Sequence, residues 1–322
     1  MKIALLAGGT GGAKLAAGLV TVLAPDQLTI IANTADDDEF WGLLVSPDVD
    51  AILYRLAGMF NERTGFGVAG DTFNALAMLE RLGEPTWFAL GDSDIGLHLL
   101  RTHLVNTGVR LTDVVAELVR RLSIAATIVP MSDDRVRTKI VTDAGEFSLQ
   151  QWFVANRCAP AVRRIRFDGV DRANPAPEAI RAVKDADAVI IGPSNPLISI
   201  DPILALLVPH LERDRVFAVS PIVGGRSLKG PTVDMLTDVG EEPTSIGIAR
   251  HYEGTAATLI IDTADAALQS SIEALGVRVV VCDIVMADAA GERRVAAEIV
   301  SIAQRAMSSG SAHADSSAST PH

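Results

Sequence analysis

Six acidic side chains fall within one short window of the sequence, and no basic residue accompanies them. Between Asn33 and Tyr54 the acids are Asp36, Asp37, Asp38, Glu39, Asp48 and Asp50. Such a run usually forms a solvated loop, but this one follows the apolar run 28–32, at the sheet edge where α/β proteins place ligands. Carboxylates suit Mg²⁺, which leaves its other positions to water and phosphate. The window predicts a metal or substrate site, with helix capping by Asp48 as the main alternative.

A glycine-rich loop follows the first apolar run, 3–7, and reads Gly8-Gly9-Thr10-Gly11-Gly12-Ala13-Lys14. Glycines allow close backbone approach to an anion, and a helix N-terminus supplies unpaired amides. The loop matches neither common phosphate-loop pattern, because Lys14 replaces the third glycine of the dinucleotide fingerprint. Asn33 stands where a nicotinamide enzyme has an acid, which disfavours that class of oxidoreductase. The loop predicts phosphate binding, and a tight turn without ligand is the alternative.

A third polar group, Leu90-Gly91-Asp92-Ser93-Asp94, follows another apolar run and precedes His98 and Arg101. In a helix, His98 and Arg101 share one face and can handle a proton or bind phosphate. A lone histidine more often packs or caps, so this alternative stays open for His98.

Two later loops also end apolar runs, namely Gly192-Pro193-Ser194-Asn195-Pro196 and Ser220-Pro221-Ile222-Val223-Gly224-Gly225. Proline fixes the shape of each loop, while Ser194, Asn195 and Ser220 offer hydroxyl and amide groups to a ligand. A structural turn explains either loop alone, but successive strand-end loops should lie along one edge of a sheet.

The elements that must position these groups alternate between short apolar runs and segments of helical period. The predicted strands are 3–7, 28–32, 87–90, 127–129, 188–191, 216–219, 258–261 and 277–281. The predicted helices are 14–23, 48–56, 72–82, 95–106, 112–122, 177–184, 202–211 and 264–275. Apolar runs of this length are typical of strands buried on both faces. The pattern predicts an α/β, doubly wound, mostly parallel sheet of the Rossmann-like kind.

One segment departs from this alternation, because residues 137–166 alternate polar and apolar side chains and contain a turn at Asp143-Ala144-Gly145. We predict a smaller antiparallel or mixed subdomain inserted at about 137–176 in an α/β domain that spans 1–306. Residues 307–322 are rich in Ser and Ala and lack periodicity, which predicts a disordered tail.

Composition limits the function classes. The 322 residues carry 28 basic and 40 acidic side chains, a net charge of −12 that disfavours a general nucleic-acid binder. No apolar run reaches the length of a membrane helix, so we expect no membrane partner. Cys158 and Cys282 form neither a disulfide framework nor a zinc pattern, which favours a cytoplasmic protein.

Taken in order, these segments resemble the motifs of the 2-phospho-L-lactate transferases, which make the deazaflavin coenzyme F(420). The segments are Gly8-Gly9-Thr10-Gly11-Gly12, Asn33-Thr34-Ala35-Asp36-Asp37, Ser46-Pro47-Asp48-Val49-Asp50, Leu90-Gly91-Asp92, Pro130-Met131-Ser132-Asp133-Asp134, Gly192-Pro193-Ser194-Asn195-Pro196 and Ser220-Pro221-Ile222. The resemblance extends from Met1 to about Ala306.

The resemblance implies a Mg²⁺-dependent reaction and commonly a homodimer. The ribityl hydroxyl of FO, 7,8-didemethyl-8-hydroxy-5-deazariboflavin, would attack the acid-bearing phosphorus of a guanosine diphospho-acid and release GMP. Asp36 resembles the metal ligand, with Asp37 beside it, and Asp50 resembles the aspartate that contacts FO. Pro193, Ser194 and Asn195 resemble part of the guanosine-diphosphate pocket.

These inferences give one set of candidate residues. We assign catalysis to Asp50, Asp36 and Lys14 and the metal to Asp36 and Asp37; we assign substrate binding to Gly9, Thr10, Gly11, Gly12, Asp48, Asp92, Ser93, His98, Arg101, Pro193, Ser194, Asn195 and Ser220. Phosphoryl-type transfer requires mainly positioning and charge neutralisation, which a metal, amide-rich loops and a few cations supply.

Two departures from the family pattern leave the donor acid open. Trp41 stands where many members carry histidine, and Ser93 where many carry arginine. Phospholactate, phosphoenolpyruvate and 3-phosphoglycerate versions all exist in the wider family. The alternative function is that of the nucleotide-sugar-binding gluconeogenesis regulators, which share the glycine loop and an acidic motif.

Overall fold

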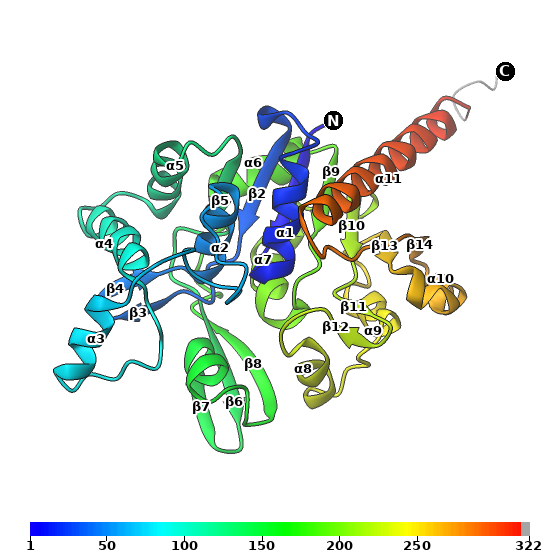
Figure 1. The fold of residues 1–322 in the computed structure, drawn as a ribbon. Coiled ribbons are helices and arrows are strands. Elements are labelled where there is room, and N and C mark those ends of the chain that lie inside the picture. The colour runs from blue at the N-terminus through cyan, green and yellow to red at the C-terminus, as the bar shows by residue number, and fades with distance from the viewer. Residues whose placement is uncertain (317–322) are drawn as a thin grey trace.

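A seven-stranded parallel sheet forms the centre of the protein (Figure 1). The computed structural model describes residues 1–316, and side chains of residues 1–308. The strands are β1 (Ile3–Ala7), β2 (Leu28–Ala32), β5 (Thr127–Pro130), β9 (Ala188–Ile191), β10 (Val216–Val219), β13 (Thr258–Ile261) and β14 (Arg278–Val281). Their order is β14-β13-β10-β9-β1-β2-β5, and every neighbouring pair is parallel. The predicted fold class is confirmed.

The strand order changes direction between β1 and β9. The chain adds β2 and β5 on one side of β1 and then returns to place β9, β10, β13 and β14 on the other. The connections after β1 and β9 therefore diverge at the carboxyl ends of these strands. Open α/β sheets bind ligands in the crevice at such a point.

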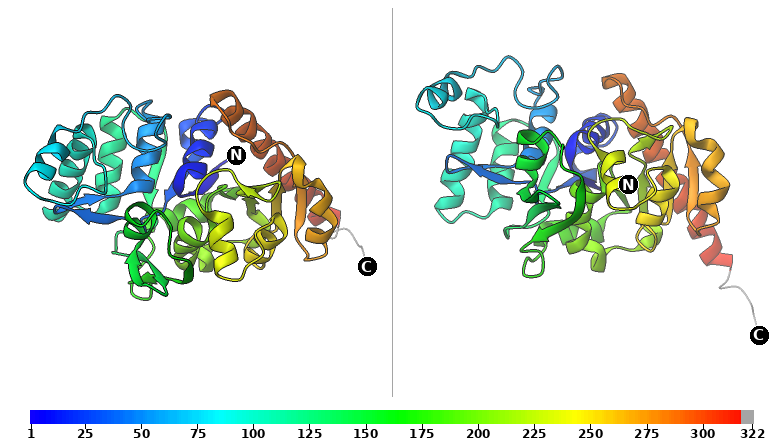
Figure 2. Two further views of the ribbon diagram at one scale, coloured as in Figure 1. Left: turned by 60° about the horizontal axis from the view of Figure 1, so that its bottom comes forward. Right: turned by 90° about the horizontal axis from the view of Figure 1, so that it is seen from below.

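Helices cover both faces of the sheet because the strand side chains alternate between two buried cores. Ile3 and Leu5 of β1 join one core, and Ala4 and Leu6 join the other. The first core includes α1 (Gly9–Leu19), α2 (Pro47–Leu56), α5 (Leu111–Arg121) and α11 (Ala289–Ser316), with α4 (Asp92–Asn106) packed against it and α3 (Asn74–Arg81) further out. The second includes α6 (Pro177–Asp185), α7 (Asp201–Leu207), α8 (Thr232–Asp238), α9 (Ser245–His251) and α10 (Gln269–Glu273). Figure 2 shows these two layers from further directions.

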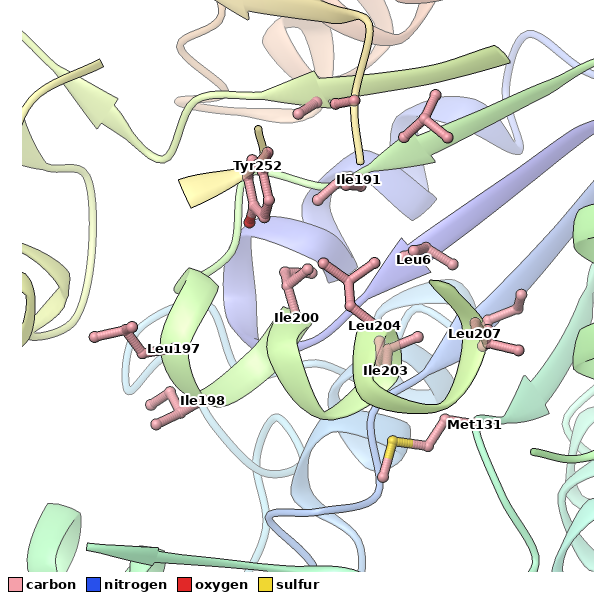
Figure 3. Packing of buried hydrophobic residues seen from close by; sticks show 14 of the residues in the cluster. Leu6, Met131, Ile191, Leu197, Ile198, Ile200, Ile203, Leu204, Leu207 and Tyr252 are labelled. Carbon is pink, nitrogen blue, oxygen red and sulfur yellow. The ribbon is translucent and has the colours of Figure 1, made fainter. Parts of the chain in front are cut away.

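A short helical turn, η3 (Pro196–Ile200), and the helix α7 that follows it are held by the second core. Figure 3 shows Ile200 and Leu204 packed beneath Leu6 of β1 and Ile191 of β9. All four side chains are buried. This packing fixes the loop that joins β9 to η3, which is one of the predicted ligand loops.

The inserted segment forms a three-stranded antiparallel sheet next to the carboxyl edge of the main sheet (Figure 1). Its strands are β6 (Arg137–Thr142), β7 (Gly145–Ser148) and β8 (Val162–Asp168), in the order β7-β6-β8. The other strands of the described residues form two antiparallel pairs. One pair is β3 (Asp38–Phe40) with β4 (Leu43–Val45), and the other is β11 (Ile222–Val223) with β12 (Arg226–Ser227). The predicted smaller subdomain is confirmed, and its own sheet is wholly antiparallel.

The predicted strand 87–90 is wrong. These residues form a connection in which Phe88 stacks on Phe40, with ring centroids 4.0 Å apart, and Trp87 meets Phe40 edge-on. A four-residue apolar run does not distinguish a strand from another buried segment. Here the aromatic rings find partners in β3, so the run packs without joining a sheet.

Helix α11 extends past the predicted start of the tail at residue 307 and ends at Ser316. The rest of the predicted tail lies outside the described residues. Within residues 1–316, no helix is long and apolar enough to cross a membrane.

His251 joins three elements on the second face of the sheet. Its Nε2 lies 2.8 Å from Asp201 Oδ1 at the start of α7, and its Nδ1 lies 2.9 Å from Glu241 Oε2, before α9. Burial alone would lower the His251 pKa, but the hydrogen bonds and charges of the two acids raise it to about 9. The protonated ring therefore donates to both carboxylates.

We predict that His251→Gln removes a pH-dependent part of the stability. The folded pKa lies above the ordinary 6.5, so the ion pairs stabilise fully below 6.5 and are lost as pH rises through about 9. The difference in free energy of unfolding between wild type and His251→Gln should shrink by up to about 3 kcal/mol across this range. Urea unfolding at several pH values measures it. His103→Gln, which removes an exposed histidine, is the control, and a pH-independent difference for His251→Gln would contradict the prediction.

Candidate active site

The glycine loop after β1 and the loop after β9 touch at the carboxyl edge of the sheet. A Cβ on Gly11 would lie 2.0 Å from the Pro193 carbonyl oxygen, and one on Gly12 would lie 3.0 Å from Ser194 Oγ. The Ser194 hydroxyl donates a hydrogen bond to the Gly8 carbonyl. The structure thus brings these predicted residues together, and glycine is required because two backbones meet here.

Asp48 caps helix α1, although it belongs to α2. Its Oδ1 accepts a 2.5 Å hydrogen bond from the Gly9 amide, and its Oδ2 accepts a 3.0 Å bond from Asn33 Nδ2. Burial raises the Asp48 pKa to about 6. The carboxylate therefore accepts the hydrogen bond of the Gly9 amide, a group that we predicted from the sequence to bind phosphate. Thr10 and Gly11 lie in the same first turn, whose amides have no partner within the helix.

Asp36 and Asp37 lie just beyond β2 and are almost fully buried, with exposed fractions of 7% and 3%. The Ser46 hydroxyl donates a 2.9 Å hydrogen bond to Asp37 Oδ2, and Gln150 Nε2 donates to the Asp36 backbone carbonyl. The Oδ1 atom of each aspartate is buried and has no protein partner. Burying a carboxylate oxygen without a partner is costly.

Because the ionised carboxylates are costly to bury, the pKa values of Asp36 and Asp37 are raised. Burial, reinforced by the charges of Asp48 and Asp37, raises the Asp36 pKa well above its ordinary value. Burial also raises the Asp37 pKa to about 7. A divalent cation would offset both effects and satisfy the open oxygens, so Asp36 and Asp37 fit a magnesium ion that keeps water or phosphate in its other positions. Within the described residues, no three His, Cys, Asp or Glu side chains are placed as a complete metal site.

Asp50 is held by Arg101, which is completely buried on α4. Arg101 donates from Nη1 to Asp50 Oδ2 at 3.0 Å and from Nη2 to Asp50 Oδ1. His98 Nδ1 lies 3.6 Å from Asp50 Oδ2, and burial lowers the His98 pKa to about 4, so the ring is neutral. His98 and Arg101 do share a helix face as predicted, but they face Asp50 of α2.

Four other candidate residues form hydrogen bonds within the protein. Lys14 Nζ donates to the Met286 carbonyl at 2.7 Å, toward the segment before α11. Asp92 accepts hydrogen bonds from Thr72 and from residues 74 and 75 at the start of α3, and the Ser93 amide donates to Asp71. The Ser220 hydroxyl donates to the Ile222 carbonyl. None of these contacts involves Asp36 or Asp37.

The structure also adds polar residues that the sequence did not single out as site residues. Asn33 joins two separated segments, since Nδ2 donates to both Asp48 and the Ile198 carbonyl, and Oδ1 accepts from the Ala35 amide. Arg137 Nη1 reaches the Thr34 carbonyl at 3.4 Å. Asn33 was visible as an unusual strand-end residue, whereas no local pattern links residue 137 to residue 34.

The fold is that of a doubly wound α/β protein, and the candidate site lies at the carboxyl ends of its parallel strands. A Bacillus halodurans protein of known structure has a similar fold, with a TM-score of 0.61, 16% identity and coverage of 93% of this chain and 99% of its own. Another structure of that protein, described as a member of the upf0052 family, gives a TM-score of 0.60. At this identity the likeness shows the fold alone.

Sequence comparison identifies the family. The family described as 2-phospho-L-lactate transferase CofD matches residues 3–300. A 2-phospho-L-lactate transferase of Methanopyrus kandleri is 38% identical over 310 residues, which cover 94% of this chain and 98% of the relative. A phosphoenolpyruvate transferase of Streptomyces avermitilis is 36% identical over 315 residues, with coverage of 94% and 98%. The chain belongs to the 2-phospho-L-lactate transferase family, and it is a transferase.

We predict that Gly11→Ala strongly destabilises the protein, because the new methyl group would meet the Pro193 carbonyl, a backbone atom that cannot rotate away. The expected loss is about 3 kcal/mol in the free energy of unfolding. Gly96→Ala is the matched control: it lies in α4 with open space around its Cβ and should stabilise by about 1 kcal/mol. Equal effects of the two changes on the unfolding midpoint would refute the close approach.

Proposed function

We propose that this protein transfers a phospho-acid group from a guanosine diphospho-acid to FO and releases GMP, in the biosynthesis of coenzyme F(420). The observation that carries the proposal is the buried pair Asp36 and Asp37, whose Oδ1 atoms have no protein partner, in a member of this transferase family. Asp48 links the pair to the glycine loop, because its charge acts on Asp36 and its carboxylate accepts a hydrogen bond from the Gly9 amide. A metal-assisted phosphate site with two adjoining loops is what such a transfer requires.

In the proposed reaction the terminal ribityl hydroxyl oxygen of FO forms a bond to the acid-bearing phosphorus. The bond between this phosphorus and the oxygen of GMP breaks, and the oxygen keeps the electron pair. The hydroxyl proton leaves to solvent or to the departing phosphate. The product is a phosphodiester, and no oxidation or reduction takes place.

The chain's own groups mainly position the two substrates. The amides of Thr10 and Gly11 bind the diphosphate, and Ser194 and Asn195 border the guanosine end. Asp36 and Asp37 would hold Mg²⁺, which when bound supplies positive charge to the phosphate oxygens. Because Asp48 already occupies the Gly9 amide, the diphosphate uses the next amides of the turn.

Asp50 orients the attacking hydroxyl in this proposal. Arg101 engages both of its oxygens, and a carboxylate retains further lone pairs that can accept a bond from the hydroxyl. The two hydrogen bonds from the buried guanidinium fix the position of the carboxylate, which suits it to orient the hydroxyl.

The donor acid is the open part of the proposal. Relatives at comparable identity are named for 2-phospho-L-lactate and for phosphoenolpyruvate. We predict that incubation with FO, Mg²⁺ and three guanosine diphospho-acids, those of lactate, enolpyruvate and glycerate, gives one FO phosphodiester in clear excess. Mass spectrometry of the products identifies it, with GMP formed in equal amount. Absence of any FO phosphodiester from all three donors would refute the proposed function.

We predict that Mg²⁺ raises the melting temperature of the apo protein, and that it does so more at about pH 8 than at about pH 5.5. The Asp37 pKa rises from 3.8 to about 7 on folding, so apo stability falls as pH increases through this window. Below about pH 7 the cation must displace the proton of Asp37, whereas above it the carboxylate is ionised and attracts the cation.

Asp36→Asn should abolish most of this Mg²⁺-dependent shift. Glu39→Gln is the control, because it removes the same charge from an exposed position in the acidic window. A Mg²⁺ shift that persists in Asp36→Asn, or that is absent from wild type at every pH, would contradict the metal assignment while leaving the transfer reaction open to its own test.

A further inference from the structure

A small pocket lies against Asp36 and Asp37, and its opposite wall comes from the inserted subdomain. That wall is the first part of β6, including Arg137 and Lys139. The Thr138 amide donates a hydrogen bond to the Ala35 carbonyl, so β6 is tied directly to the acidic segment. The pocket therefore has an acidic side and a basic side.

Arg137 and Lys139 lie on the same face of β6, because side chains two residues apart in a strand point the same way. Thr138 and Ile140 lie on the other face and are buried. Arg137 and Lys139 are half-buried, which keeps both charges near the pocket. The alternation explains how one strand packs on the core and still presents two cations.

Both cations retain unused hydrogen-bond donors. Arg137 Nη1 donates to the carbonyls of Thr34 and Val136, but its Nε is buried and has no partner. Among the described residues, the Lys139 ammonium group forms no hydrogen bond or ion pair, although the backbone of this residue belongs to the β6 ladder. Across the pocket, the Oδ1 atoms of Asp36 and Asp37 also lack protein partners. These buried unpartnered atoms on both sides indicate a ligand that carries negative charge and reaches a bound cation.

We propose that Arg137 and Lys139 bind the carboxylate of the acid that is transferred. This inference rests on the proposed function. With the guanosine end at Ser194 and the diphosphate at the glycine loop, the acid is the part of the donor that lies beyond Asp36 and Asp37, toward β6. Arginine binds carboxylates through a planar fork, and lysine adds a point charge.

A different role for Arg137 makes a different prediction. If it only compensates the negative charge of Asp36 and Asp37, its loss weakens every diphosphate donor equally, whether or not the donor has a carboxylate. If it binds the carboxylate, its loss weakens only the donor that carries one.

The experiment compares two donors: the guanosine diphospho-acid that wild type uses best, and the β-ethyl ester of GDP, which lacks the carboxylate. Dissociation constants for both are measured calorimetrically with Mg²⁺, in wild type, Arg137→Ala and Lys139→Ala. Wild type should prefer the acid donor by at least about tenfold, and each variant should lose most of this preference. Lys139→Arg should restore part of it.

Arg164→Ala is the matched control, since it removes one positive charge from an exposed position on β8, outside the pocket, and should retain the preference. Circular dichroism checks that each variant folds. Equal weakening of both donors in Arg137→Ala and Lys139→Ala would overturn the inference, as would a wild type without preference or without binding of either donor. Selective binding without any transfer to FO would uphold the carboxylate site and refute the proposed function.

Discussion

Three carboxylates, those of Asp36, Asp37 and Asp48, are buried together at the carboxyl edge of the sheet, and their mutual repulsion has to be balanced. Asp48 is balanced within the protein, by the Gly9 amide and Asn33. Asp36 and Asp37 are balanced only in part, because one oxygen of each has no protein partner. The remaining attraction for positive charge is what makes this edge suitable for a cation and the phosphates that accompany it.

Much of the surrounding structure serves to hold these groups in place. The close contact between Gly11 and Pro193 brings the loops of β1 and β9 together, and η3 and α7 support the second loop from below (Figure 3). The Asp50–Arg101 pair ties α2 to α4 on the other side. A buried ion pair is costly to break, which gives the site a rigid wall even where no substrate is bound.

The sequence predicted the parts of the fold that depend on local patterns. Apolar runs identified the seven strands of the sheet, and the glycines and acids after β1 and β2 indicated the candidate site, because strand ends and sharp turns have local signatures. The run 87–90 was misassigned because its aromatic residues pack on Phe40, a contact that no local pattern encodes. For the same reason the sequence did not decide whether Asp48 binds a ligand or caps a helix. It also gave no sign that Arg137 lies near Asp36. Such pairings are decided by which segments meet in three dimensions.

The proposed site depends on a cation at Asp36 and Asp37, and the most direct measurement is a crystal structure of the protein grown with Mn²⁺ and GDP. An anomalous difference map should place the metal within about 2.5 Å of the carboxylate oxygens of Asp36 or Asp37, with a phosphate oxygen completing its contacts. A well-ordered metal bound elsewhere, with GDP in place and both aspartates contacting only protein groups, would contradict the account.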